Sequence, residues 1–211
     1  MPPSKPVSCV PVFDMGGVLI DWNPRYLFRN FFDGNSQGVE RFLDEIDFWN
    51  WNAGMDRGQP FAEGVAAWSA RFPQYANLIR AFDARWEETA GGPIPGMADI
   101  LLRLRRAGHP LYGLSNSSTE KFRTLRSRFP FLNDFSRIVL SGEVGVNKPD
   151  PRIFDLFLDR TGRRKEELLF IDDTEANISA ARRLGWQSIR FLSAEQLERE
   201  LAERGFALMN R

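Results

Sequence analysis

The residue most clearly placed to take part in chemistry is Asp14, which ends an apolar run and is followed by Gly16 and Gly17. A carboxylate at the end of a strand faces the carboxyl edge of a sheet, where open α/β folds bind their ligands. The two glycines permit a positive φ and a close approach of the backbone to a ligand. Asp14 is therefore a candidate functional residue, and the alternative is a turn aspartate that only caps a loop.

Two further segments offer groups that suit a phosphate. Ser115 and Asn116 end a second apolar run, and the following Ser117 to Glu120 predicts a capping box that opens a helix. A helix start with hydroxyl and amide donors beside it is a natural seat for a phosphate. Lys148 precedes another predicted helix and carries a compact ammonium on a long stem. Simple helix capping and a surface lysine in a loop are the alternatives for these segments.

Two adjacent carboxylates, Asp172 and Asp173, terminate a fully apolar run that includes Phe170 and Ile171. Like charges side by side raise each other's pKa unless a cation lies between them and other acids. Mg²⁺ is a hard ion that prefers oxygen ligands and would resolve this conflict. The pair therefore indicates a metal site.

The elements that must position these residues alternate between short apolar runs and amphipathic stretches, which predicts βαβ units and a parallel sheet of the α/β class. The predicted strands are 10–13, 111–114, 138–140, 168–171 and 188–191. The predicted helices are 96–107, 119–128, 150–161, 175–184 and 194–204.

The stretch 22–94 breaks this alternation, because it reads as consecutive helices near 24–32, 38–48, 60–71 and 74–88 with no strand between them. We expect it to be a helical cap domain over the carboxyl edge, inserted into a core domain made of 7–21 and 95–211. Residues 20–23 and 91–96 would be the hinges. Five of the six tryptophans lie here, and we expect them to pack the helical bundle.

The composition excludes several classes of partner. Lys and Arg together number 28, as do Asp and Glu, so no net charge favours nucleic acid or an anionic membrane. The sequence has no apolar run of the roughly 20 residues that a membrane span requires, and its start does not resemble a signal peptide. Together with a single cysteine, Cys9, this predicts a cytoplasmic protein. We expect a monomer or a small homo-oligomer.

The four segments, in this order and each at a predicted strand end, resemble the haloacid dehalogenase superfamily, most of whose members are phosphatases. Asp14 matches the first motif, Ser115-Asn116 the second, Lys148-Pro149 the third and Asp172-Asp173 the fourth. The resemblance implies a Rossmann-like core with an inserted helical cap of the C1 type. The amino-acid sequences of the first, second and fourth motifs are most similar to those of the sugar-phosphate (glucose-1-phosphate) phosphatase-like branch.

The resemblance implies a Mg²⁺-dependent phosphatase that acts on a small-molecule phosphate ester. Asp14 would be the nucleophile and form an aspartyl-phosphate. Ser115, Asn116 and Lys148 would hold the phosphoryl oxygens, and Lys148 would also offset the charge of Asp14. The metal ligands would be Asp14, the backbone carbonyl of Gly16 and Asp173, with Asp172 as an occasional ligand or a residue behind the ligands.

The sequence departs from the family at Gly16, where typical phosphatases carry an aspartate that acts as general acid and base. General acid–base catalysis contributes roughly 10²–10⁴-fold, so we expect slow turnover of esters with poor leaving groups. A cap acid such as Asp56 or Glu63, or a substrate-bound water, would be the substitute. Asn177 lies where many relatives carry another acid, which leaves its role open.

Two other functions fit the same residues. A 2-haloacid dehalogenase uses the same aspartate on carbon without a metal, although the paired Asp172 and Asp173 favour a metal. A phosphate-ester-binding protein with weakened catalysis would keep the site and lack the acid at Gly16.

Overall fold

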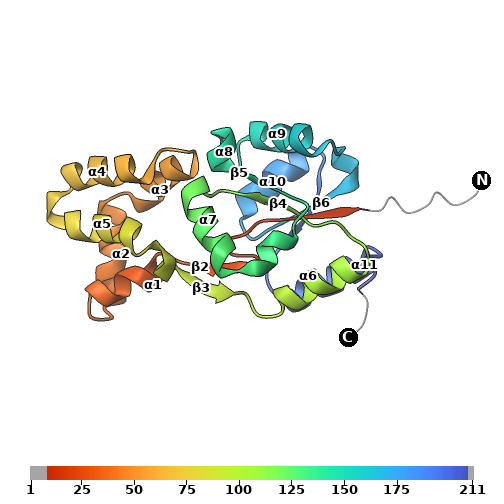
Figure 1. Ribbon diagram of the computed structural model, residues 1–211, viewed down its shortest axis with the longest axis horizontal. Coiled ribbons are helices and arrows are strands. Elements are labelled where there is room, and N and C mark those ends of the chain that lie inside the picture. Colours follow the sequence, from red (N-terminus) through yellow and green to blue (C-terminus); the bar gives the residue numbers. More distant parts are fainter. Residues whose placement is uncertain (1–8, 209–211) are drawn as a thin grey trace, which may run out of the picture.

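The computed structural model describes residues 9–208 and is built on a five-stranded sheet in which every pairing is parallel (Figure 1). The strand order is β5 (Arg137–Leu140), β4 (Tyr112–Ser115), β1 (Val10–Phe13), β6 (Leu168–Asp172) and β7 (Gln187–Arg190). The predicted α/β class with a parallel sheet is confirmed. The expectations about the chain start and the boundary at residue 7 lie outside the described residues.

Helices cover both faces of this sheet (Figure 1). On one face α9 (Pro151–Thr161) and α10 (Glu175–Arg183) pack on Val12 and Phe170. On the other face α6 (Met97–Arg106), α7 (Thr119–Arg128) and α11 (Ala194–Glu203) share a core with Phe13 and Ile171. Successive strand residues point to opposite faces, so a sheet buried on both sides needs continuous apolar strands. None of the helices among residues 9–208 is long and apolar enough to span a membrane.

A group of helices lies beside the core at one end of the molecule (Figure 1). It contains α1 (Arg25–Phe28), α2 (Ser36–Glu45), α3 (Phe48–Asp56), α4 (Phe61–Arg71) and α5 (Ala76–Ala84). Its interior is aromatic, since Phe82 contacts the rings of Phe28, Phe48 and Trp51. Trp51 is buried as expected, whereas Trp49 is half exposed.

The structure differs from the sequence-based expectations in three local details. The segments taken as hinges form an antiparallel ribbon of β2 (Ile20–Trp22) and β3 (Ala90–Pro93). Neither strand shows alternation in the sequence, because β2 is only three residues long and β3 contains two glycines. The helix expected over 38–48 ends at Glu45, and α3 begins after Asp47, whose left-handed φ of 50° breaks the helix. A one-turn helix, α8 (Ser141–Val144), was also missed.

The register of the sheet brings the motif residues to one edge. β1 lies between β4 and β6, and Phe13 pairs with both Gly113 and Ile171. The backbone N–H of Asp14 donates to the carbonyl of Ile171 at 2.9 Å. Asp14 therefore lies level with Asp172, and the ends of all three strands face the same side.

Candidate active site

A cavity of about 700 Å³ opens at the carboxyl edge of the sheet. From the core it is lined by residues at or just after the ends of β1, β4 and β6, in the loop before α9 and on α10: Asp14, Gly16, Ser115, Asn116, Lys148, Asp173 and Asn177. From β2 and the helical group it is lined by Trp22, Trp49, Asn52, Asp56 and Arg57. The cavity thus lies between the sheet and the inserted helices.

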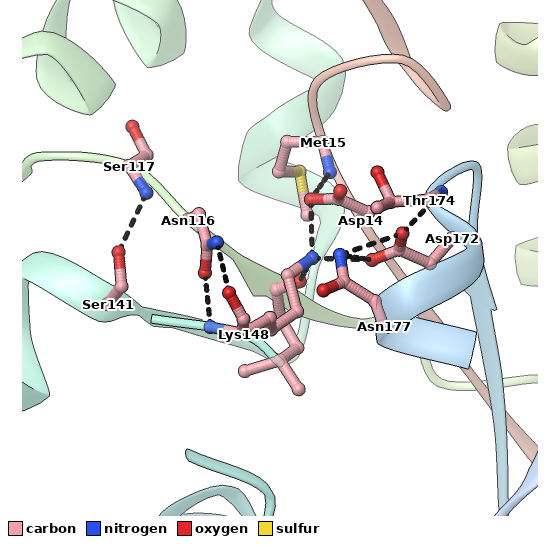
Figure 2. A network of polar contacts seen from close by, with 10 residues as sticks. Asp14, Met15, Asn116, Ser117, Ser141, Lys148, Asp172, Thr174 and Asn177 are labelled. Carbon is pink, nitrogen blue, oxygen red and sulfur yellow. Dashed lines mark hydrogen bonds and ion pairs between the residues drawn. The ribbon is translucent and has the colours of Figure 1, made fainter. Parts of the chain in front are cut away.

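Lys148 lies at the centre of the polar network (Figure 2). Its side chain is fully buried, and its Nζ lies 3.0 Å from Oδ1 of Asp14 and 2.7 Å from Oδ2 of Asp172. Nζ also donates to the carbonyl of Leu114 at 2.8 Å. Burial alone would lower the pKa of Lys148, but the charges of Asp14 and Asp172 outweigh it and the pKa is raised. The ammonium is therefore held charged between two carboxylates.

Asp172 is fully buried and its two carboxylate oxygens are engaged by the protein. Asn177 donates to both oxygens at 3.0 Å, and the N–H of Thr174 donates to Oδ1 at 2.8 Å (Figure 2). With Lys148 on Oδ2, every oxygen has at least two donors. Asn177, whose role the sequence left open, therefore holds Asp172 in place.

The side chain of Asn116 clamps the backbone of Lys148 (Figure 2). Its Oδ1 accepts from the N–H of Lys148 at 2.7 Å, and its Nδ2 donates to the Lys148 carbonyl at 2.9 Å. These bonds tie the second motif to the third across 32 residues of sequence. Asn116 thus fixes the position from which the Lys148 ammonium reaches Asp14.

The segment after Ser115 differs from the predicted capping box. Ser115 is buried at the end of β4, but the residue that caps α7 is Ser118, whose Oγ accepts from the N–H of Lys121 at 3.1 Å. Ser117 instead donates its N–H to Oγ of Ser141 at 2.9 Å (Figure 2). The helix therefore starts one residue later than a box from Ser117 to Glu120 requires.

Three carboxylates gather beside this network. Oxygens of Asp14, Asp172 and Asp173 lie within 4.8 Å of one another. Burial raises the pKa of Asp14 to about 7, Lys148 opposes the rise, and Asp172 and Asp173 add to it. Burial, followed by the charge of Asp172, also raises the pKa of Asp173. A partly buried cluster of carboxylate oxygens of this kind fits a hard divalent cation, which would relieve the repulsion.

The two acids considered from the sequence as substitutes for an acid at Gly16 differ in position. Asp56 ends α3 and lines the cavity, whereas Glu63 is exposed on α4 and does not line it. Nothing in the sequence around the two residues distinguished them, because the distinction depends on how α3 packs against the core.

Comparison with known proteins agrees with this arrangement. A family model described as haloacid dehalogenase-like hydrolase matches residues 11–185. A phosphoserine phosphatase from Thermus thermophilus is 25% identical over 202 residues, which cover 82% of this chain and 79% of that protein. A sesquiterpene phosphatase from Aspergillus oryzae is 28% identical over 182 residues, covering 82% of this chain and 85% of that protein.

A solved structure extends the comparison. An enzyme of the same family from Bacteroides thetaiotaomicron, in complex with magnesium and inorganic phosphate, superimposes with a TM-score of 0.69 and 27% identity. The match covers 88% of this chain and 94% of that one. Other relatives are much longer: the chain spans 20% of the length of a drimenol cyclase from Aspergillus calidoustus, to which it is 33% identical over 107 residues.

Proposed function

Because the chain belongs to the haloacid dehalogenase-like hydrolase family, we propose that it is a Mg²⁺-dependent phosphatase acting on a small phosphorylated metabolite. Asp14 is the nucleophile in this proposal and forms an aspartyl-phosphate. The observation that carries it is the buried Lys148 ammonium between Asp14 and Asp172, beside the third carboxylate, Asp173. The phosphatases among the relatives support the reaction class.

Asp14, Asp173 and the backbone carbonyl of Gly16 would hold the Mg²⁺ ion in this proposal. Asp172 already accepts bonds from Lys148, Asn177 and Thr174, so we assign it to positioning Lys148 rather than to the ion. When bound, Mg²⁺ supplies positive charge against the phosphoryl oxygens and the neighbouring carboxylates. The magnesium and phosphate in the Bacteroides relative support this choice of ion.

The other catalytic roles in this proposal belong to side chains and backbone groups of this chain. Lys148 opposes the effect of burial on Asp14 and so favours the anionic form, which is the form that attacks phosphorus. The Ser115 hydroxyl and the Asn116 backbone N–H would donate to the phosphoryl oxygens, since the Asn116 side chain is committed to Lys148. Attack forms the Asp14–phosphorus bond and breaks the bond to the leaving oxygen, and water then hydrolyses the aspartyl-phosphate.

We propose that 22–94 is a cap domain on a core made of 7–21 and 95–211, and that the cap sets the substrate. Its contribution to the cavity combines the rings of Trp22 and Trp49 with the polar groups of Asn52 and Arg57. Flat rings beside hydrogen-bonding groups suit a ligand with both apolar faces and hydroxyls. A phosphorylated sugar is therefore the first substrate class to test.

The proposed function is tested by following phosphate release from phosphate esters and halide release from 2-haloacids, each with Mg²⁺ and with EDTA. We expect phosphate release with Mg²⁺ alone. Halide release in EDTA would replace the proposal by a dehalogenase. Saturable binding of esters without turnover in either condition would replace it by a binding protein.

A further inference from the structure

We propose that Asp56, supplied by the cap helix α3, transfers the proton in each half of the reaction. This inference rests on the proposed function, because it assigns a group to a reaction at Asp14. It concerns the position that Gly16 leaves without an acid. Four features of the structure support it.

The first feature is that Asp56 shares its surroundings with Gly16. Both residues line the main cavity together with Asp14, and both also line a smaller adjoining cavity of about 70 Å³ with Trp22 and Asn52. A Cβ at Gly16 would meet only the Cβ of Trp22, at 3.7 Å. The space that a side chain at Gly16 would occupy is therefore part of the cavity that Asp56 lines.

The second feature is that the Asp56 carboxyl is oriented by its own helix. Nδ2 of Asn52, one helical turn earlier and itself buried, donates to Oδ2 of Asp56 at 2.7 Å. Residues four apart lie on one face of a helix, so both side chains face the cavity. A carboxyl fixed by one donor keeps a preferred direction when substrate binds.

The third feature is a pair of bonds that fastens this end of α3 to the core. Oγ of Ser141, on α8, donates to the backbone carbonyl of Asp56 at 2.5 Å and also accepts the N–H of Ser117. Nδ2 of Asn147, adjacent to Lys148, donates to the carbonyl of Ala53 at 2.9 Å. The backbone that carries Asp56 is thus linked to both core segments that would hold the phosphoryl group.

The fourth feature is the charge state of Asp56. Burial raises its pKa to about 8, the backbone N–H of Ser118 lowers it, the charge of Asp14 raises it, and Arg57 lowers it. Lys121 also lines the smaller cavity, but its ammonium is paired with Asp83. The raised pKa favours the protonated carboxyl at neutral pH, and a pKa close to the working pH also lets the carboxylate accept a proton.

These features give a balanced proton cycle. In the first half, Asp14 bonds to phosphorus, the bond from phosphorus to the leaving oxygen breaks, and that oxygen takes the proton of Asp56. The alcohol leaves and Asp56 becomes a carboxylate. In the second half, the carboxylate takes a proton from water as the water oxygen bonds to phosphorus. The Asp14–phosphorus bond breaks, which releases phosphate and restores both side chains.

Asp56→Asn tests this role because it keeps the shape of the side chain and removes its proton. The probes are n-propyl phosphate, whose alkoxide leaves poorly, and p-nitrophenyl phosphate, whose leaving group needs no proton. Single-turnover release of each alcohol isolates the first half of the reaction. We expect the propyl rate to fall by about 10²–10⁴-fold and the nitrophenyl rate by less than about tenfold. A folding defect would lower both rates by the same factor.

Glu63→Gln is the matched control, since it neutralises an exposed acid of the same cap and should leave both rates unchanged. Equal losses on the two probes in an Asp56→Asn protein whose circular dichroism spectrum matches that of the wild type, or no loss, would overturn the role of Asp56. The same holds if the wild type cleaves only the nitrophenyl ester, an outcome that leaves the proposed function standing. If neither ester is cleaved with Mg²⁺, the proposed function fails and the inference fails with it.

Adding Gly16→Asp to the Asp56→Asn variant provides a second test, because a Cβ fits at Gly16 without a close contact. An acid restored on the core side should recover the propyl rate selectively, by at least about tenfold. In the double variant, a propyl rate that stays at the level of Asp56→Asn while the nitrophenyl rate is normal would contradict the proposal. It would show that an acid at residue 16 cannot replace Asp56 in proton transfer.

Discussion

Gly17 lies so close to the Asp173 carboxylate that a Cβ at position 17 would displace that carboxylate. A Cβ at Gly17 would lie 2.5 Å from Oδ2 of Asp173, a distance that real side chains do not tolerate. Gly17 also has a φ of 76°, in the left-handed region that favours glycine. The glycine turn after Asp14 therefore lets the fourth-motif carboxylate approach the first motif.

This relationship predicts that Gly17→Ala displaces the Asp173 carboxylate and weakens Mg²⁺ binding. We expect the Mg²⁺ concentration for half-maximal phosphatase activity to rise by at least about tenfold, which corresponds to about 1.4 kcal/mol. Gly162→Ala is the control, because Gly162 also has a positive φ but has nothing within 4 Å of a Cβ. An unchanged Mg²⁺ requirement in Gly17→Ala would show that the contact does not position a ligand.

Lys148→Met should destabilise the protein as well as inactivate it. The substitution leaves Asp14 and Asp172 buried without their shared cation, and breaking a buried pair in this way costs about 3–5 kcal/mol. Urea unfolding measures the loss. Arg164→Met, which removes an ion pair to Glu167 from a largely exposed arginine, should cost less than about 1 kcal/mol. Equal losses of unfolding free energy in the two variants would refute the claim that Lys148 neutralises two buried carboxylates.

The raised pKa of Asp56 predicts a pH dependence of stability. Its folded pKa of about 8 exceeds the ordinary value of 3.8, so the folded state binds a proton that the unfolded state has lost between these values. The contribution is complete below the unfolded pKa and disappears as pH rises to the folded one. Between about pH 5 and pH 9 the wild type should therefore lose more stability than Asp56→Asn, measured by urea unfolding in EDTA. Parallel curves would show that the pKa of Asp56 is not raised.

The sequence was most informative where parallel topology does the positioning. Asp14, Ser115 and Asp172 each follow an apolar run, and parallel strands bring their carboxyl ends to one edge. Their proximity could thus be expected without knowing the strand order. The order itself, with β1 between β4 and β6, explains why Asp14 and Asp172 share Lys148.

The sequence was least informative where one side chain is held by another from a distant element. The bonds from Asn177 to Asp172 and from Asn116 to Lys148 depend on side-chain directions that no local pattern encodes. Asp56 could not be preferred over Glu63 for the same reason. Left-handed Asp47 separates α2 from α3, a helix that the periodicity did not predict, so a single backbone angle can also escape sequence analysis.

The central claim, that Asp14 is the nucleophile of a metal-dependent phosphatase, is tested most directly with p-nitrophenyl phosphate. Turnover would be measured for the wild type with Mg²⁺, for the wild type with EDTA, and for Asp14→Asn with Mg²⁺. The account predicts p-nitrophenol release in the first condition alone. Release by Asp14→Asn at the wild-type rate, or by the wild type in EDTA, would contradict it.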